Sequence, residues 1–524
     1  MLVLVSIVFY CRSLFFQLTG LDDFILLKRL EENNSNFQSL TRVFKPGSYG
    51  PWVSYYRPVF YDTIILNYLG FGSGPFSYHL VNVFLHALVA WVVMNLLQQL
   101  HFTKRQAFVL SLIYALHPLM TQAVCWIPGR NDLLLGLFTF SYCYNSIEYS
   151  ITNHRKNIFL AVVFLALALF TKEAALMAPL GLTALLVFRH GLQQFKKEIL
   201  PHITVAAIGW CLIFIARYLH APAHLVGGKQ GILSNIWVHK YVPFFYLGKI
   251  VAPFNLGTFP AMASKDLHVI IGGLAISLLS ALVIRKKLSA QYAVGGLLFF
   301  GAFIIPFIIS HDALIGKPLY EHRMYIPLLG VLIVAGKLLN SVSGAGRKFT
   351  IAFATFVLAY FTIAGQVHQS DFSNSYSFWK KSVENAPNNP RTNLSFALQQ
   401  LNNEAEAIKY ISRAEKLSPN EHLLQFSKGV VYMQHGKFDL ADSAFKRELA
   451  TTKYYECYFY LSKIAFDKND FNKAVAFLMV YNDRNPYYSL QYKHELNQKL
   501  ATAQNGEQLM AALYAKKMQC YFEN

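Results

Sequence analysis

The sequence predicts an all-α protein in two parts, a polytopic helical membrane domain followed by a soluble solenoid of helical repeats. Of the 524 residues, 54% are hydrophobic and only 14% are charged, whereas a soluble domain carries about 25% charged residues. Long apolar stretches end near residue 370, and a self-similar pattern starts near residue 378. We therefore expect a membrane domain at 1–370 and a repeat domain at 371–524.

The positive charge of the chain belongs mainly to the expected membrane domain. Residues 1–370 contain 28 Lys/Arg and 12 Asp/Glu, and residues 371–524 contain 19 and 16. Basic loops flanking membrane helices explain this excess better than nucleic-acid binding does, so no nucleic-acid partner is expected. The six cysteines are scattered and form no CxxC pair, which argues against a disulfide scaffold or a cysteine metal site.

A membrane-spanning helix needs about 20 mostly apolar residues. By this criterion we expect eleven spans, at 1–19, 77–99, 106–122, 131–149, 156–171, 173–189, 200–219, 267–284, 291–310, 324–340 and 349–367. The first lacks a basic region and a small-residue cleavage site, so we interpret it as a retained span rather than a cleaved signal.

The apolar stretch 235–256 is a separate case. Two prolines and two lysines interrupt it, which favours a re-entrant or interfacial helix pair; these are Lys240, Pro243, Lys249 and Pro253. The alternative is a true span paired with another that the pattern does not reveal.

The basic residues predict the orientation. With the N-terminus in the cytoplasm, 13 of the 28 basic residues of 1–370 fall in five short inward loops, among them Arg285, Lys286 and Lys287. This is the asymmetry of the positive-inside rule. The loop 20–76 and the whole repeat domain then lie outside the cytoplasm.

The C-terminal part contains a repeat of about 34 residues. Ala407, Ala441 and Ala474 follow one another at intervals of 34 and 33 residues, and Phe438 precedes Phe471 by 33. A proline closes several units; these are Pro387, Pro419 and Pro486. Small residues at this period indicate three to four tetratricopeptide repeats, with a helical cap expected near 491–519. Such solenoids bind peptides or partner proteins, although a structural spacer or dimerisation module is the alternative.

The first outside loop contains two adjacent carboxylates, Asp22 and Asp23, directly after an apolar run. Repulsion between them and a low-dielectric boundary raise the pKa of one, which suits a general base near neutral pH. Farther along, residues 57–69 place Tyr61, Ile64, Ile65 and Tyr68 on one face. We interpret this segment as a helix along the membrane surface.

Other polar residues occur where a lipid-facing helix would not tolerate them, and most are assigned to the same outside end. Ionisable groups at such depth are candidates for function, although each alone could be an interfacial anchor. Arg323, Lys172 and Arg130 are candidates for neutralising a lipid-linked phosphate. The remaining candidates for the substrate site are Arg57, His79, Asn82, His86, His117, Asp132, Glu173, Glu321 and His322.

The spacing of His79, Asn82 and His86, three and then four residues, could also be interpreted as a metal site. Metal binding needs several carboxylates or histidines in a defined geometry, so no metal is expected.

Several of these stretches together resemble the transmembrane, TPR-containing O-mannosyltransferases and their bacterial relatives, which have the GT-C glycosyltransferase fold. The resemblance rests on "LDDFILL", on "YRPVFYDTIILNYLGFGSGPFSYHLVNVFLHAL", on "ALHPLMTQAVCWIPGRNDLL", and on "FTKEAA", "FYLGKIVAPFNLGTFP" and "YEHRMYIPLLG". Met120 and Gln122 stand where the family usually has His and Glu, and one residue separates Glu321 from Arg323.

The resemblance implies inverting transfer of a monosaccharide from a polyprenyl-phosphate donor to an acceptor hydroxyl. One Asp of the pair would be the general base, its neighbour would position the acceptor, and the basic residues would hold the donor phosphate. Because basic side chains hold the leaving phosphate, no cofactor and no obligatory metal are implied. Asp22 is our preferred base.

Three interpretations of the function remain. The first is a membrane glycosyltransferase that modifies protein Ser/Thr brought by the repeat domain. The second is the same core acting on a lipid or polysaccharide, and the third is a non-enzymatic membrane scaffold. The short repeat array and compact loops favour a bacterial plasma membrane with a periplasmic active face over the endoplasmic reticulum.

Overall fold

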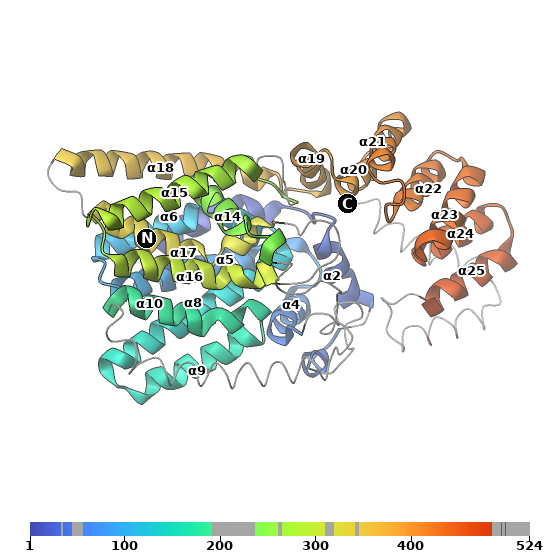
Figure 1. Ribbon diagram of the computed structural model, residues 1–524. Coiled ribbons are helices and arrows are strands. Elements are labelled where there is room, and N and C mark those ends of the chain that lie inside the picture. The colour runs from blue at the N-terminus through green and yellow to red at the C-terminus, as the bar shows by residue number, and fades with distance from the viewer. Residues whose placement is uncertain are drawn as a thin grey trace.

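The structure is a computed structural model that describes residues 1–32, 35–44, 56–190, 236–259, 265–309, 319–340 and 345–484, together with 494 and 498. Within these residues every regular element is a helix, in agreement with the predicted all-α class. The expected span 200–219 and the expected cap near 491–519 lie outside the described ranges. Figure 1 shows a bundle of long helices joined through α18 and α19 to a second group of shorter helices.

The N-terminal half of the bundle contains ten α-helices and four short 3₁₀ helices in its described residues. Their bounds are α1 (Leu2–Tyr10), η1 (Cys11–Phe15), α2 (Asp22–Glu32), α3 (Ser39–Arg42), α4 (Pro58–Phe71), α5 (Pro75–Gln99), α6 (Lys104–Leu116), η3 (Pro118–Met120), α7 (Thr121–Cys125), η4 (Ile127–Gly129), α8 (Arg130–Thr152), α9 (Arg155–Leu169), η5 (Glu173–Met177) and α10 (Ala178–His190).

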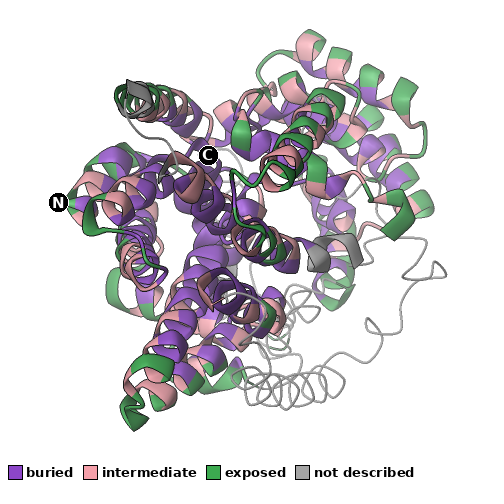
Figure 2. Cartoon of the chain, turned by 60° about the vertical axis from the view of Figure 1, so that its left-hand side comes forward, coloured by how far each residue is buried: buried purple, intermediate pink, exposed green. Residues whose placement is uncertain are grey.

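The rest of the bundle follows after residue 235. Its described elements are α14 (Val242–Val251), α15 (Lys265–Ile284), α16 (Ala290–Ile309), η7 (Glu321–Met324), α17 (Leu328–Asn340) and α18 (Ala345–Ser370). One large cluster of buried hydrophobic residues joins helices from both halves, and it includes Phe9 of α1, Leu96 of α5, Phe299 of α16 and Ile333 of α17. Figure 2 shows buried residues gathered inside the bundle, with exposed residues on its outer surface.

In the part of the chain that the structure describes, three helices are long and apolar enough to cross a membrane: Pro75–Gln99, Lys265–Ile284 and Ile351–Ser370. The helix pair Lys104–Leu116 and Pro118–Cys125, bent by 55° at its break, is either a fourth, broken span or a re-entrant loop. Large apolar side chains face outward on two of these helices, including Ile270, Leu274, Phe356 and Ile363, as expected for lipid contact. The chain is therefore a multi-pass membrane protein, and the count of eleven spans stays a prediction.

The segment 235–256 contains a short helix in its described part. The helix α14 has ten residues, about 15 Å at 1.5 Å per residue, half of the hydrocarbon thickness. It packs closely on α15, because a Cβ at Gly248 or Gly272 would collide with the backbone of the facing helix. Such small-residue crossings are typical of helices in membranes. The length of α14 agrees with an interfacial or re-entrant helix.

The interpretation of 57–69 needs a correction. The helix is present as α4, but its predicted apolar face is not free to lie on a membrane. Tyr61, Ile64 and Ile65 are buried, and they pack in one cluster with Leu26, Leu27 and Leu30 of α2. The same apolar stripe that suits a membrane surface suits a neighbouring helix equally well.

Basic side chains gather where α5, α6, α10, α16 and α17 meet. The guanidinium of Arg189 donates to the carbonyl of Gln99, and the Lys337 amine lies 4.6 Å from the centroid of the Phe102 ring. Arg189 and Lys337 both act electrostatically on His101. Arg189 and Lys337, from two of the predicted inward basic loops, therefore lie at the same end of the bundle, and the side of the membrane that this end faces stays a prediction.

The C-terminal helices form the predicted solenoid. Their bounds are α19 (Ser375–Asn385), α20 (Pro390–Ala397), α21 (Glu404–Leu417), α22 (Leu424–Gln434), α23 (Phe438–Thr452), α24 (Glu456–Asp467) and α25 (Phe471–Arg484). Ala407, Ala441 and Ala474 are each fully buried. They lie at equivalent places in α21, α23 and α25, so the 34-residue period marks tightly packed helix crossings.

Candidate active site

The two carboxylates of the acidic pair have different surroundings. Asp23 is 1% exposed; one of its oxygens, Oδ2, accepts hydrogen bonds from the backbone N–H of Thr19 at 2.6 Å and from the Thr19 hydroxyl at 2.9 Å. Its Oδ1 accepts from the backbone N–H of Phe24 at 2.9 Å. Asp22 is partly exposed at the start of α2. The pair therefore consists of one buried carboxylate held by the turn and one that is only partly exposed.

The pKa of Asp22 is raised to about 6 by burial and by repulsion from Asp23, and the positive charges of Arg391 and Arg57 partly offset this. Burial also raises the pKa of Asp23, against the hydrogen bonds from Thr19 and Phe24. The repulsion expected from the sequence is present, but burial contributes more. At neutral pH Asp22 is mostly ionised, with a basicity well above that of an ordinary aspartate.

Two ion pairs lie near one another, and Arg57 of the first pair also acts on Asp22. The guanidinium of Arg57, the residue before α4, contacts the carboxylate of Glu173 at 2.7 Å. The amine of Lys172 contacts both oxygens of Asp132, at 2.7 and 2.8 Å. Asp132 is in the first turn of α8, where the helix dipole also favours a negative charge. Four predicted site residues are therefore brought together in pairs.

Three basic residues surround His322. Burial and the charges of Lys172, Arg323 and Arg57 lower the pKa of His322, so its imidazole is neutral at neutral pH. The His322 Nε2 lies 3.9 Å from Asp132, and Arg323 lies over the Tyr320 ring, 5.8 Å from its centroid. The charge of Arg57 acts on both His322 and Asp22, which connects the basic group with the acidic pair.

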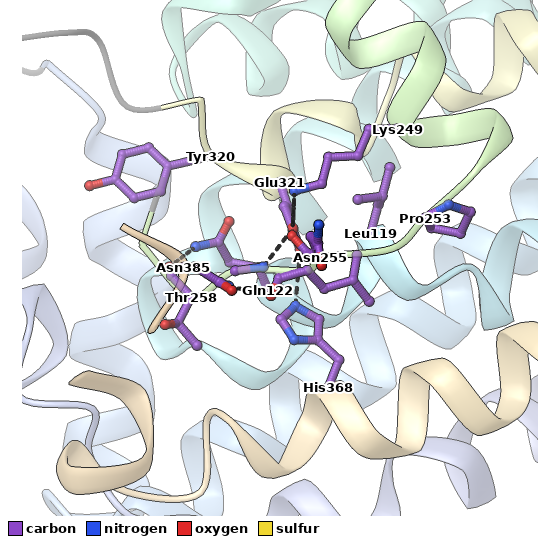
Figure 3. A network of polar contacts seen from close by, with 12 residues as sticks. Leu119, Gln122, Lys249, Pro253, Asn255, Thr258, Tyr320, Glu321, His368 and Asn385 are labelled. Carbon is purple, nitrogen blue, oxygen red and sulfur yellow. Dashed lines mark hydrogen bonds and ion pairs between the residues drawn. The ribbon is translucent and has the colours of Figure 1, made fainter. Parts of the chain in front are cut away.

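Glu321 lies in a separate buried network (Figure 3). Its Oε1 accepts from the amine of Lys249 at 2.7 Å and from the backbone N–H of Gly257 at 2.9 Å. Its Oε2 bonds to His368 at 2.9 Å, and His368 bonds in turn to Asp371. Burial alone would raise the pKa of Glu321, but Lys249 and His368 bring it down to about 2. Both carboxylate oxygens of Glu321 are engaged by protein groups, so the network holds η7, α14 and α18 together.

Gln122 belongs to the same surroundings and replaces the glutamate usual in the resembled family. Its side-chain oxygen accepts from the backbone N–H of His322 at 3.0 Å, and its amide donates to the Thr258 carbonyl at 2.8 Å. A neutral amide can donate and accept at once, so Gln122 joins two loops that a carboxylate could not join in this way. Met120 is fully buried in the hydrophobic core.

Arg130 is fully buried, and its guanidinium is surrounded by neutral acceptors. It donates to Asn82 Oδ1, to Asn67 Oδ1, and to the carbonyls of Thr63 and Tyr78, at 2.9 to 3.1 Å. These contacts tie α4 and α5 to the start of α8. The predicted contact of Arg130 with a donor phosphate is untested, and its guanidinium has no exposed surface to offer.

The predicted histidines are buried within the bundle. His86 bonds to the Tyr325 hydroxyl at 2.8 Å and to the Ala115 carbonyl at 3.0 Å. His117 bonds to the carbonyl of Ile250 at 3.1 Å, and the His79 ring lies against the Phe16 ring. Among the described residues no group of three or more His, Cys, Asp and Glu side chains is arranged to hold a metal ion.

Several residues of this region are not among the site candidates that the sequence predicts. In the sequence Lys249 is only an interruption of an apolar stretch, whereas in the structure its side chain is 3% exposed and forms an ion pair with Glu321. His368 and Asp371 follow the last span at a spacing of three residues, a signal that could have suggested their contact. Arg391 lies in the repeat domain, where the period predicts packing alone.

Known proteins support the resemblance. Residues 58–218 match the family described as dolichyl-phosphate-mannose-protein mannosyltransferase, and residues 391–421 match the tetratricopeptide repeat family. The chain is also similar to several protein O-mannosyltransferases. Human Protein O-mannosyl-transferase TMTC1 is 25% identical over 445 residues, which cover 70% of this chain and 48% of that protein.

Other relatives match in the same way. Human Protein O-mannosyl-transferase TMTC3 is 21% identical, over 74% of this chain and 47% of its own length. Drosophila melanogaster Protein O-mannosyl-transferase Tmtc1 is 33% identical over 141 residues, 27% of this chain and 16% of that protein. The chain thus spans about half the length of the human relatives that it matches.

A solved structure is also similar to this chain. It is ArnT from Cupriavidus metallidurans bound to undecaprenyl phosphate, with 16% sequence identity and a TM-score of 0.38, covering 85% of this chain and 79% of ArnT.

Proposed function

We propose that the chain is an integral-membrane inverting glycosyltransferase that moves a monosaccharide from a polyprenyl-phosphate donor to an acceptor hydroxyl. The observation that carries this proposal is the acidic pair: Asp23 is held by Thr19 and Phe24, and Asp22 is left partly exposed with a pKa of about 6. The match of residues 58–218 to a mannosyltransferase family supports the reaction class.

In this mechanism Asp22 accepts the proton of the acceptor hydroxyl while the oxygen of that hydroxyl forms a bond to the anomeric carbon of the sugar. The bond from that carbon to the lipid phosphate breaks, and the phosphate leaves with the electron pair. A base with a pKa near the working pH suits this step. Asp23 orients the first turn of α2, and Asp22 thereby keeps a fixed direction.

Arg57, Lys172 and Arg323 are the proposed binding group for the donor phosphate. All three charges lower the pKa of His322, whose imidazole is neutral. Arginine guanidinium groups and lysine amines both neutralise phosphate well. Each of the pairs Arg57–Glu173 and Lys172–Asp132 keeps its cation in place before the donor arrives. For Arg130 we propose a positioning role, because neutral acceptors already engage its guanidinium.

We infer further that 1–370 is the catalytic membrane domain with eleven spans and that 371–524 is a repeat domain on the same outer face. A protein Ser/Thr brought by the solenoid is the proposed acceptor, and a bacterial plasma membrane is the proposed location. The meeting of the basic loops at one end of the bundle supports the orientation.

The test is transfer of labelled mannose from polyprenyl-phosphate mannose by the purified full chain in liposomes, with a membrane-protein extract as acceptor. We expect Asp22→Asn to lower transfer by about 10²- to 10⁴-fold. The control is Asp266→Asn, because the Asp266 side chain is 92% exposed at the start of α15. Full transfer by both Asp22→Asn and Asp23→Asn would refute the catalytic assignment and favour the scaffold. Label in lipid rather than protein would favour the second acceptor class.

A further inference from the structure

Arg391 brings a positive charge from the repeat domain to the acidic pair. It is the second residue of α20, and its guanidinium carbon lies 5.8 Å from the centroid of the Phe259 ring. Phe259 is buried after α14, and its ring lies 5.9 Å from Tyr320 and 5.8 Å from Trp379 of α19. Aromatic rings from the membrane and repeat domains thus form one cluster, and the Arg391 guanidinium lies over the Phe259 ring of this cluster.

The loop that carries Phe259 is fastened to the repeat domain. The Thr258 hydroxyl lies 2.8 Å from both the Phe378 carbonyl and the Ser382 hydroxyl of α19. The Asn385 amide donates to the Leu256 carbonyl at 2.6 Å. Figure 3 shows Thr258 and Asn385 beside the Glu321 network. The position of α19, and of α20 directly after it, is therefore set by the membrane domain.

The turn before the acidic pair contacts the same helix. Gly20 has a φ of 69°, and a Cβ there would meet the side chain of Ser375, the first residue of α19. Upstream, the backbone N–H of Gln17 donates to the Ser373 carbonyl at 2.9 Å. One helix of the repeat domain is thus anchored both to the loop of Phe259 and to the turn that presents Asp22.

The charged groups that face Asp22 come from three segments. Asp23 raises the pKa of the Asp22 carboxyl, after the larger effect of burial, and Arg391 and Arg57 lower it. The guanidinium of Arg57 forms an ion pair with the Glu173 carboxylate at 2.7 Å. Arg391 has no carboxylate within 4 Å among the residues that the structure describes. Of these two cations, Arg391 of the repeat domain is therefore the one whose charge is less neutralised by a neighbouring carboxylate.

We propose that Arg391 is a positioning residue for the reaction at Asp22, so that the active site is completed by the first helices of the repeat domain. This inference rests on the proposed function. The guanidinium favours the ionised, proton-accepting form of Asp22. A membrane domain whose repeat domain is displaced would keep Asp22 but hold its proton more tightly, so docking of α19 and α20 supports catalysis.

The experiment measures the protonation of Asp22 directly in the full chain, without a sugar substrate. A hydrophobic carbodiimide modifies protonated carboxyl groups, and mass spectrometry of the Asp22 peptide gives the extent at each pH. We expect the midpoint to move upward by on the order of one pH unit in Arg391→Gln and farther in Arg391→Glu. Arg391→Lys should stay near the wild-type midpoint.

The matched control is Arg413→Gln, an exposed arginine on α21, which should leave the midpoint unchanged. In the transfer assay, the acidic limb of kcat/KM should shift with the carbodiimide midpoint across the Lys, Gln and Glu series. A purely structural role would lower kcat without moving this limb.

Equal midpoints in wild type and in all three Arg391 variants would overturn the inference. Such a result would leave the proposed function intact as long as Asp22→Asn still abolished transfer. Conversely, full transfer by Asp22→Asn would remove the proposed function, while a shifted carbodiimide midpoint would still establish the electrostatic contact.

Discussion

The ion pairs Lys249–Glu321 in the membrane domain and Lys468–Asp439 in the repeat domain have nearly equal lengths, 2.7 and 2.6 Å. Their surroundings differ: the first pair is 3% and 2% exposed, the second 47% and 95%. A charge in water needs no partner, whereas a buried charge without its partner is costly. The comparison teaches that distance alone does not identify the pairs on which the fold depends.

The buried pairs of the membrane domain also lie where chemistry is proposed. Glu321 holds the loop that carries Phe259 through Gly257, and Lys172–Asp132 lies beside His322. In the repeat domain, pairs such as Lys409–Glu406 and Lys437–Glu404 are surface contacts. The helices there are held by buried residues such as Ala441 and Phe445 instead.

The largest effect should come from Glu321→Gln, which leaves the Lys249 amine buried without its carboxylate. We expect a loss of about 3–5 kcal/mol in the free energy of unfolding, measured as reduced thermal stability in detergent. The double variant Lys249→Met/Glu321→Gln should recover part of this loss, because it removes the unpaired charge. A single variant as stable as the wild type would contradict the contrast between the two regions.

The same pair predicts a pH dependence. The folded pKa of Glu321 is about 2, below its ordinary value of 4.5. Its contribution to stability is therefore fully present above pH 4.5 and is lost as the pH falls from 4.5 through about 2. The difference in stability between wild type and Glu321→Gln should shrink over this range.

A somewhat smaller effect is expected from Arg130→Met. The substitution leaves the acceptors Asn82 and Asn67 and two carbonyls without their donor, at a cost of about 3 kcal/mol. Arg130→Lys should recover little, because an amine cannot reproduce the planar fork of donors. Arg155→Met, at an exposed arginine beginning α9, is the control and should leave thermal stability unchanged.

Asp22→Asn should have the opposite sign for stability. Because the folded pKa of Asp22, about 6, lies above its ordinary 3.8, ionisation destabilises the fold as the pH rises from 3.8 through about 6. Well above this range the variant should be more stable than the wild type, by up to about 3 kcal/mol. Below it the two should unfold alike. If wild type and Asp22→Asn were equally stable both below and above this pH range, the raised pKa of Asp22 would be contradicted.

The sequence was sufficient for the helical class, for most apolar helices and for the repeat, because each depends on local periodicity. Ala407 and Ala441 could be placed at helix crossings by counting residues alone. The acidic pair was also visible, since two adjacent carboxylates after an apolar run conflict with simple membrane insertion.

The partners of these residues could not be found in the same way. Lys249 and Glu321 are 72 residues apart, and Arg57 and Glu173 are 116 apart, so no local pattern connects them. The stripe of Tyr61, Ile64 and Ile65 predicted a helix but not what covers it, because a lipid surface and a neighbouring helix select the same residues.

The smallest effect should come from Lys468→Gln, which removes the exposed partner of Asp439. This pair links the end of α24 to the start of α23. Both side chains return to water when the pair is broken, and the order that the pair imposes on them is released. We therefore expect no resolvable change in the melting temperature of the full chain, at low or at high salt. A melting temperature lowered by several degrees at low salt would place Lys468 in a cooperative charge network along the solenoid. In that case exposed pairs would also support the array that presents Arg391 to Asp22, and burial would no longer separate the two regions.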